Sequence, residues 1–199
     1  MSRLVLATGN AHKVQELHEI LSAAGLVVDL VALPADAPDV VEDELTFAGN
    51  ALKKARSAAA FTGLPSVADD SGLAVDALNG MPGVFSARWA GRARDDLANL
   101  ELLLEQISDV PDEHRTGAFV CAAALVTPAG HEEVVEGLMP GRVIRDPRGT
   151  NGFGYDPIFV PDAGDGRTTA ELPAAEKNAI SHRGKAFRAL ASALGRHLG

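Results

Sequence analysis

The 199-residue sequence has few aromatic residues, a single cysteine, no internal repeat and no long apolar run. No apolar stretch approaches the roughly 18–20 residues of a transmembrane helix. Near the N-terminus, residues 4–7 are apolar, but this stretch is too short for a signal peptide and ends at Thr8. We therefore expect a soluble, cytoplasmic protein that has no membrane partner.

Positive charge is also scarce, with 18 lysine and arginine residues against 27 aspartate and glutamate residues and a net charge of -9. Such a balance opposes binding to nucleic acid polymers and to anionic membranes. A small anionic ligand would need a local basic patch or a metal ion. Cys121 lies in the apolar run 118–126, which predicts a buried, unreactive thiol in a reducing compartment.

The N-terminal part of the chain has the pattern of a β-α-β unit. The apolar residues 4–7 predict a buried strand. Val14, Leu17 and Leu21 recur at helical spacing and predict a helix with one apolar face, and residues 26–31 predict a second strand. This order favours two parallel strands with a right-handed crossover. Because 46% of the residues are hydrophobic, the chain can bury one sizeable core, which fits a single domain.

The rest of the chain alternates between loops, helices and strands. Residues 34–45 are rich in acids and proline and predict an exposed loop, after which Thr46 can N-cap a helix that ends near residue 61. We expect further strands at residues 64–68, 73–78, 116–127, 132–139 and 158–160, and further helices starting at Asp95 or Asp96, at residue 174 and after Ser181. The strands on either side of residues 128–131 predict an antiparallel hairpin.

Two adjacent acids, Asp69 and Asp70, end an apolar run and are followed by Ser71 and Gly72. A buried strand that delivers acids to a glycine turn is one way in which α/β proteins position a metal ion or a general base. An ordinary Asp-rich turn is the alternative. Because side chains alternate along a strand, we expect one acid to brace the turn and the other to face a site. Gly72 would let the backbone pass close to a bound phosphate.

Two further groups suit a charged ligand. Thr8, Gly9 and Asn10 join a strand to a helix whose first turn carries Lys13, and the N–H groups at such a helix start suit a phosphate. An ordinary β-α turn is the alternative, because the spacing of standard phosphate-binding loops is missing. The acids of residues 42–44 either stabilise the dipole of the following helix or bind Mg²⁺ together with an acid of the strand.

The C-terminal half carries a glycine-dense loop and several cations. Phe153 and Tyr155 in this loop can stack on a planar base, although core packing explains them equally well. Lys177 can bind a phosphate or a base oxygen. His182 and Arg183 open a helix, where cations are unfavourable unless an anion lies nearby, and this mismatch favours a functional role.

Several short motifs occur in order along the chain: Leu6-Ala7-Thr8-Gly9-Asn10 with Lys13, Thr46-Phe47 with Asn50-Ala51 and Lys54-Ala55, Ala68-Asp69-Asp70-Ser71-Gly72-Leu73, Pro82-Gly83, Ser86-Ala87-Arg88, Gly152-Phe153-Gly154-Tyr155-Asp156-Pro157, Glu176-Lys177 and Ser181-His182-Arg183-Gly184. No single motif is decisive, but the ordered set closely resembles the noncanonical purine nucleoside triphosphate pyrophosphatases. The resemblance extends from residue 4 to about residue 190.

This resemblance implies an α/β fold in which an elongated mixed β-sheet with flanking helices forms two lobes around a central substrate cleft. It implies that residues 1–199 form one bilobal domain and that the protein is a homodimer. The implied activity is the Mg²⁺-dependent hydrolysis of XTP, ITP and dITP to the monophosphate and pyrophosphate, which cleanses the nucleotide pool. A pyrophosphatase for modified pyrimidine nucleotides and a non-catalytic nucleotide-binding module are the alternatives.

Carried over by position, the resemblance makes Asp70 the general base and a Mg²⁺ contact and Glu42 the second metal ligand. The residues that it implies for substrate binding are Thr8, Gly9, Asn10, Ala11, His12, Lys13, Ser71, Phe153, Gly154, Tyr155, Asp156, Lys177, His182 and Arg183. Glu44 stands where many members have a glycine, which leaves the ligand open among Glu42, Asp43 and Glu44. Gly49 stands where an acid is common, which removes a capping-box partner for the helix.

Overall fold

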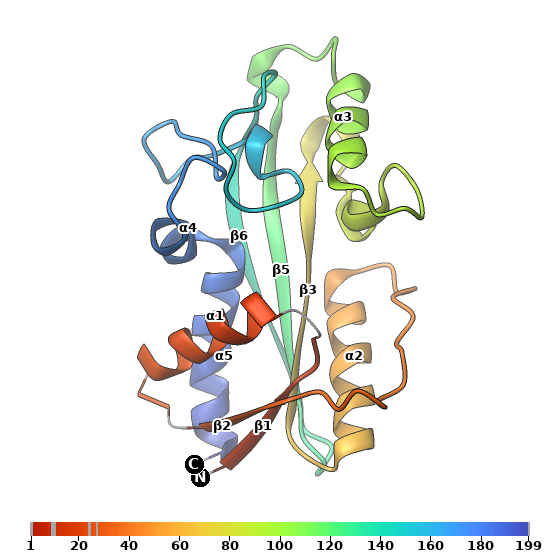
Figure 1. Ribbon diagram of the computed structural model, residues 1–199, viewed down its shortest axis with the longest axis vertical. Coiled ribbons are helices and arrows are strands. Elements are labelled where there is room, and N and C mark those ends of the chain that lie inside the picture. Colours follow the sequence, from red (N-terminus) through yellow and green to blue (C-terminus); the bar gives the residue numbers. More distant parts are fainter. Residues whose placement is uncertain (1, 9–10, 24, 27, 199) are drawn as a thin grey trace. The chain divides into compact units, whose positions relative to one another are not determined.

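The structure is a computed structural model that describes residues 2–8, 11–23, 25–26 and 28–198. Its helices and strands are, in order, β1 (Ser2–Leu6), α1 (Ala11–Ala23), β2 (Val28–Ala32), α2 (Phe47–Thr62), β3 (Ser66–Val75), β4 (Met81–Pro82), α3 (Asp96–Gln106), β5 (Thr116–Val126), β6 (Glu132–Val143), β7 (Phe159–Pro161), α4 (Ala174–Ile180) and α5 (His182–Leu198) (Figure 1). Within the described ranges, none of the helices combines the length and the apolar composition that crossing a membrane requires.

The strands of the described residues form one sheet in the order β2-β1-β3-β5-β6-β7, with β4 paired to β3. β1 runs parallel to β2 and to β3, with Leu4 opposite Leu30 and Leu6 opposite Val67. β7 pairs antiparallel with β6, and β4 pairs antiparallel with β3. The predicted mixed sheet with flanking helices and the parallel β-α-β opening are therefore confirmed.

The chain divides into two compact units, and β3, β5 and β6 contribute residues to both of them. The first unit comprises residues 1–70, 121–137 and 183–199, and the second comprises residues 71–120 and 138–182. That the whole chain is one bilobal domain, and that a substrate cleft lies between its lobes, remain predictions.

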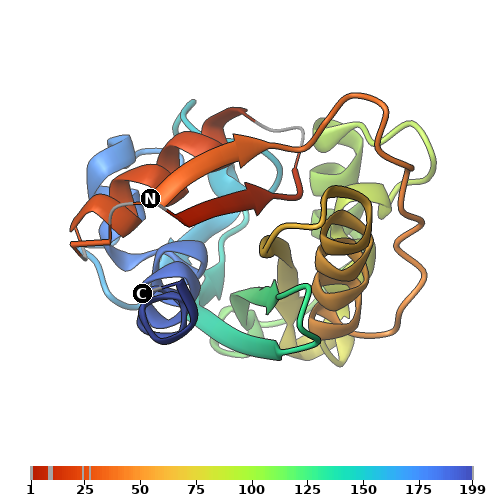
Figure 2. The ribbon, with the colours of Figure 1, turned by 90° about the horizontal axis from the view of Figure 1, so that it is seen from below.

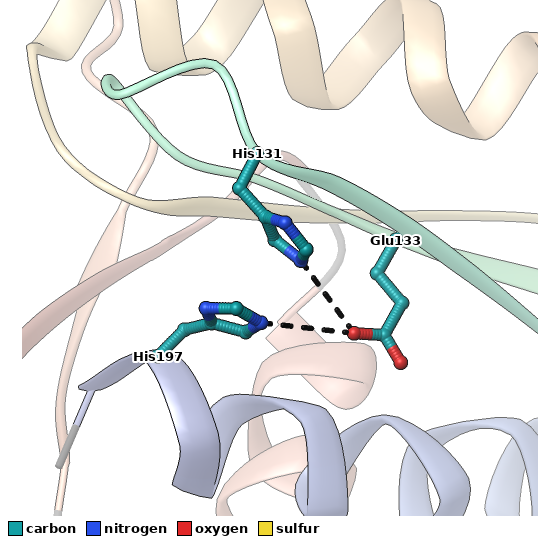
Figure 3. Close-up of side chains that lie close together, drawn as sticks. All are labelled: His131, Glu133 and His197. Carbon is teal, nitrogen blue, oxygen red and sulfur yellow. Dashed lines mark ion pairs between the residues drawn. The ribbon is translucent and has the colours of Figure 1, made fainter.

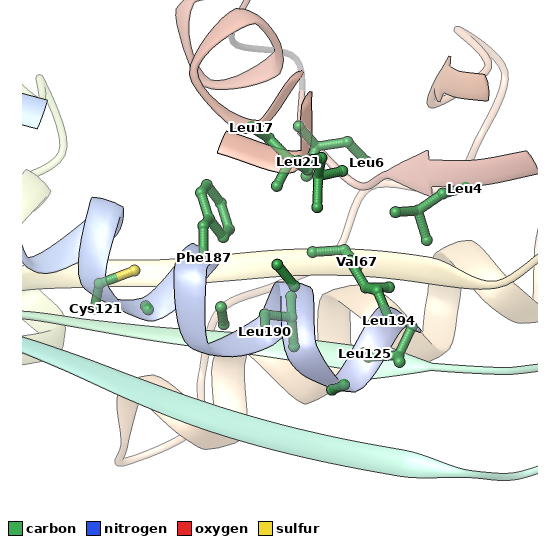
Figure 4. Close-up of a cluster of buried hydrophobic side chains, with 14 residues drawn as sticks. Leu4, Leu6, Leu17, Leu21, Val67, Cys121, Leu125, Phe187, Leu190 and Leu194 are labelled. Atoms are coloured by element: carbon green, nitrogen blue, oxygen red, sulfur yellow. The ribbon is translucent and has the colours of Figure 1, made fainter. Parts of the chain in front are cut away.

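In the first unit, hydrophobic side chains cover both faces of the sheet. On one face, Val67 of β3 and the β5 residues Cys121, Ala123 and Leu125 pack against α1 and α5, which contribute Leu17 and Phe187 among others (Figure 4). On the other face, Ala68 packs against the alanines of α2, of which Ala55 is fully buried. Figure 2 shows α2 and α5 on opposite sides of the strands. Consecutive residues of β3 therefore face different helices.

The predicted end of a strand at Asp69 is wrong, because β3 continues without a break from Ser66 to Val75 and is followed by a 3₁₀ turn. The turn propensity of its acids and glycine is overridden by the sheet, in which β3 pairs with β1 at Ser66 and Val67 and has β5 as its neighbour on the other side. Gly72 also differs from the expectation. A Cβ atom there would lie 2.4 Å from Ser86 Oγ and 2.5 Å from the carbonyl of Gly83, so the close approach is to protein.

In the second unit, Arg115 is the largest fully buried side chain of the described residues. Its guanidinium donates hydrogen bonds to the carbonyl oxygens of Ile107 (2.6 Å), Val143 (3.0 Å) and Ile144 (3.4 Å). It thereby joins the end of α3 to the end of β6. Burial lowers the pKa of Arg115, although not enough to deprotonate a guanidinium at neutral pH.

We expect Arg115→Met to destabilise the protein by about 3 kcal/mol, because the three carbonyl oxygens lose a charged donor and stay buried. The exposed Arg142 on β6 supplies a matched control, and Arg142→Met should change the free energy of unfolding by less than about 0.5 kcal/mol. Urea denaturation of both variants measures the difference. Equal stabilities would show that the carbonyl contacts of Arg115 contribute nothing.

Candidate active site

The two adjacent acids of β3 point to opposite faces of the sheet, as alternation along a strand predicts. Asp69 is 2% exposed, and its Oδ2 accepts a hydrogen bond of 3.3 Å from Arg183 Nε in the first turn of α5. Asp70 points to the other face, where its Oδ2 accepts a hydrogen bond of 2.9 Å from Asn50 Nδ2 on α2. The anion that Arg183 needs at a helix start is therefore Asp69, a residue of the protein itself.

Asn50 connects the acid of the strand to the loop that precedes α2. Its side chain is 1% exposed, and while its amide group donates to Asp70, its Oδ1 accepts a hydrogen bond of 3.0 Å from the backbone N–H of Glu44. Both ends of the side chain are thus used, which fixes its orientation. The orientation of the Asp70 carboxylate follows from that of Asn50.

Lys54 lies one helical turn after Asn50 and brings a second carboxylate close to Asp70. Its Nζ is 2.5 Å from Glu42 Oε1 and 3.7 Å from Asp70 Oδ1. Asp43 instead pairs with Lys53, whose hydrogen bond lowers the pKa of that exposed acid. Of the three neighbouring acids of the loop, Glu42 is thus the one that shares a cation with Asp70.

The chemistry of this group fits a hard divalent cation. Glu42 and Asp70 both offer carboxylate oxygens, the donors that Mg²⁺ prefers. Their side chains are only 30% and 14% exposed, and an ammonium group lies against both of them. Glu42 and Asp70 are therefore the described residues here that could hold such a cation in place of the ammonium group.

Glu44 and Gly49, the two positions at which the sequence departs from the family pattern, lie close together. A Cβ atom at Gly49 would lie 2.8 Å from Glu44 Cβ and 3.1 Å from Thr46 Oγ1. Thr46 caps α2, as predicted, by accepting a hydrogen bond of 3.0 Å from the N–H of Gly49. The side chain at position 44 thus occupies the space that a side chain at position 49 would need.

In the second unit, the glycine-dense loop folds around Asp156. This residue is 3% exposed, and its Oδ2 accepts a hydrogen bond of 2.9 Å from the N–H of Phe153 and pairs with Lys177 Nζ at 2.5 Å. A Cβ atom at Gly152 would lie only 2.0 Å from the same oxygen, and the φ of Gly152 is 77°. Glycine is therefore required at this position for the loop to reach the carboxylate.

The two aromatic residues of this loop have different environments. Phe153 is 61% exposed, and Lys177 Nζ lies 5.5 Å from the centre of its ring. Tyr155 is buried in the core of the unit and donates a hydrogen bond of 2.9 Å to the carbonyl of Ser86, and burial raises its pKa. Core packing accounts for Tyr155, whereas Phe153 offers a ring to solvent.

The other predicted site residues are distributed as follows. Gly9 and Asn10 lie outside the described residues, and so do the side chains of Ala11, His12 and Lys13 at the start of α1. Thr8 and Ser71 are partly buried, and the backbone N–H of Gly154 donates a hydrogen bond to Asp96. His182 is buried, and its ring stacks on that of Phe119 with 5.0 Å between the ring centres. Within the described residues, a groove of about 710 Å³ in the second unit contains none of them.

Asn50 and Lys54 are functional candidates that the sequence pattern marked only as motif residues, without a role. Their spacing of four residues on α2 places them on one helix face, a signal that is visible in the sequence. What the sequence does not show is that this face lies against Asp70 rather than against solvent.

Comparison with known proteins identifies the family of this chain. Residues 4–193 match the sequence profile of the Ham1 family. The chain is 63% identical to a dITP/XTP pyrophosphatase of Streptomyces coelicolor over 192 residues, which cover 96% of each protein. Among solved structures, a HAM1 protein from Coxiella burnetii is similar with a TM-score of 0.91 and 42% identity, covering 98% of this chain and all of that one. A structure described as a nucleoside-triphosphatase or dITP/XTP pyrophosphatase from Mycobacterium abscessus is 56% identical, with a TM-score of 0.79 and coverage of 94% and 97%. The chain therefore belongs to the Ham1 family.

Proposed function

We propose that this chain hydrolyses noncanonical purine nucleoside triphosphates, namely XTP, ITP and dITP, to the monophosphate and pyrophosphate, and so removes them from the nucleotide pool. Relatives named dITP/XTP pyrophosphatase that match almost the full chain at 54–63% identity support this activity. The observation that carries it in the structure is the group around Asp70, in which Asp70 and Glu42 share Lys54 and the buried Asn50 donates a hydrogen bond to Asp70.

Glu42 and Asp70 are the proposed ligands of Mg²⁺. When bound, the ion would neutralise negative charge on the phosphates and act as a Lewis acid. Lys54, which lies against both carboxylates, is suited to pair with a phosphate oxygen as the carboxylates take up the metal. The shared lysine supports Glu42, rather than Asp43 or Glu44, as the second ligand.

Asp70 is the proposed general base, which accepts the proton of a water molecule that attacks the α-phosphorus. Because Asn50 holds one carboxylate oxygen, the carboxylate is oriented before substrate binds. Asp69 does not share this role, since its pairing with the buried Arg183 makes it part of the core. This arrangement keeps two neighbouring acids from competing for one proton.

The phosphates are proposed to bind at the start of α1, with Ser71 as a further contact. The proposed residues are Thr8, Gly9, Asn10, Ala11, His12 and Lys13. α1 begins at Ala11, a few residues after the end of β1, and the N–H groups of a helix start favour an anion.

The base is proposed to stack on Phe153, whose ring is exposed and has Lys177 beside it. Gly154, Asp156, His182 and Arg183 complete the proposed set, and Tyr155 supports the loop from the core. To select a 6-oxo purine, the protein needs a hydrogen-bond donor that faces the 6-oxo group. Adenine has an amino group at this position, which is itself a donor, so the donor of the protein would stay unpaired. One unpaired buried donor costs about 1–3 kcal/mol.

Two finer points belong to the same proposal. We infer that the enzyme acts in the cytoplasm, where the nucleotide pool is, and that it is a homodimer, as the family resemblance implies. Within the first unit, Val41 and Leu45 are large hydrophobic residues with 69% and 87% exposure. Their exposure is consistent with burial in a dimer interface.

The substrate proposal predicts that pyrophosphate is released from ITP, XTP and dITP with Mg²⁺, at least tenfold faster than from GTP, ATP, dTTP or dUTP. Pyrophosphate assays across this panel, with and without EDTA, test it. Faster turnover of dTTP or dUTP would indicate a pyrimidine nucleotide enzyme instead. Binding of ITP without any product would indicate a non-catalytic module.

Asp70→Asn should lower kcat by about 10²–10⁴, the usual contribution of a general base, while the fold is retained. The exposed Asp29 on β2 offers a control, and Asp29→Asn should leave turnover unchanged. Circular dichroism and steady-state kinetics on dITP compare the two variants. Turnover near that of the wild type in Asp70→Asn would remove Asp70 from this role.

Phe153→Ala should lower kcat/KM by about 10–100-fold, because stacking of a base on an aromatic ring contributes roughly 1–3 kcal/mol. The loss should appear mainly in KM. Phe61, a partly exposed phenylalanine on α2, is the matched control. If Phe61→Ala and Phe153→Ala have the same small effect on dITP hydrolysis, the base does not stack on this loop.

A further inference from the structure

A second group of potential ligands lies in the first unit and shares no residue with the site around Asp70. Among the described residues, His131, Glu133 and His197 bring one ligand atom each to within 4.8 Å of one another. His131 comes from the turn between β5 and β6, Glu133 from β6 and His197 from the last turn of α5. Figure 3 shows both imidazole rings directed toward the carboxylate.

The distances in this group are those of metal ligands rather than of hydrogen-bond partners. Nε2 of His131 lies 3.6 Å from Glu133 Oε2, and Nε2 of His197 lies 3.9 Å from the same oxygen. Nitrogen–oxygen hydrogen bonds have lengths of about 2.7–3.2 Å. Ligands at about 2.0–2.1 Å from a tetrahedral Zn²⁺ ion are about 3.4 Å apart. A small adjustment of side chains would therefore suffice to hold an ion.

One ligand atom also needs a partner. Nε2 of His131 is buried and makes no hydrogen bond. The rings of His131 and His197 lie 3.8 Å apart with an angle of 31° between their planes. A metal ion would supply the missing partner, because an imidazole nitrogen binds a metal through its lone pair.

The backbone and a neighbouring arginine hold the ligands in place. The carbonyl of His131 accepts a hydrogen bond from the N–H of Thr127 (2.9 Å), and its own N–H donates to Thr127 Oγ1 (3.2 Å). Glu133 lies two residues further along the chain, in β6. Arg196 Nη2 donates to Glu133 Oε1 at 2.9 Å and to Oε2 at 3.2 Å, a contact that orients the carboxylate.

We propose that His131, Glu133 and His197 bind a Zn²⁺ ion, with solvent as the remaining ligand, and that the ion fastens the end of α5 to the turn between β5 and β6. Two imidazoles and a carboxylate suit Zn²⁺, whereas Mg²⁺ prefers oxygen ligands alone. The net charge of -9 favours the uptake of a cation. The site is structural and independent of the proposed catalytic reaction.

Titration calorimetry with ZnCl₂, in millimolar Mg²⁺ to occupy oxygen-only sites, tests this proposal. The wild type should bind one Zn²⁺ ion per chain at this site. The double variant His131→Gln/His197→Gln should bind it at least about 100-fold more weakly, because loss of even an outer-shell partner of a metal site lowers metal affinity by about 10–100-fold. The exposed His18 and His114 supply the control, and His18→Gln/His114→Gln should bind Zn²⁺ as the wild type does. Equal affinity in the wild type and in His131→Gln/His197→Gln would overturn the proposal.

Thermal unfolding supplies a second readout that does not depend on activity. Zn²⁺ at about a hundred times its Kd should raise the Tm of the wild type by about 5–10 °C and leave that of His131→Gln/His197→Gln unchanged. Pyrophosphate release from dITP with Mg²⁺ should be the same in both proteins. The absence of a Zn²⁺-dependent shift in the wild type would contradict the proposed site without affecting the proposed hydrolysis.

Discussion

The alternation of side chains along β3 determines which of its residues face α2 and which face α5 in the first unit. Asp69 and Asp70 are neighbours in the chain, yet one is paired with Arg183 of α5 and the other with Asn50 of α2. A buried carboxylate without a partner is strongly destabilising, so Asp69 fixes where the start of α5 can lie. Asp70 is less buried and is held by a neutral amide. Asp69 is therefore a structural anion, whereas its neighbour Asp70 is the proposed general base.

The loop before α2 is attached to this arrangement at two points. Asn50 accepts a hydrogen bond from the backbone of Glu44, and Lys54 pairs with Glu42. Residues 33–45 form no helix or strand, so these contacts, together with the tight packing of Glu44 against Gly49, determine where the acids lie. α2 thus positions the Glu42 carboxylate of the loop beside the Asp70 carboxylate of β3. Binding and catalytic residues commonly lie on loops that a rigid scaffold positions in this way.

Local signals in the sequence were sufficient for most of the secondary structure. The cap at Thr46 and the β-α-β opening were predicted correctly from the pattern of neighbouring residues. Asp69 and Asp70 point to opposite faces, as alternation predicts, but Asp69 pairs with Arg183 of α5 and does not brace a turn. The false end of β3 arose because local turn propensity cannot reveal the strands that pair with it.

The parts of the site that the sequence did not reveal depend on distant contacts. Asp69 and Arg183 are 114 residues apart, and no local pattern links them. The same is true of His197, which meets His131 and Glu133 only because the end of α5 packs near the turn between β5 and β6.

We propose that water attacks the α-phosphorus of a 6-oxo purine nucleoside triphosphate, in a reaction organised by Asp70. Hydrolysis of dITP with Mg²⁺ in ¹⁸O-labelled water, followed by mass spectrometry of both products, tests it most directly. We expect one ¹⁸O atom in the nucleoside monophosphate and none in pyrophosphate. Label in pyrophosphate, or release of orthophosphate in place of pyrophosphate, would contradict it.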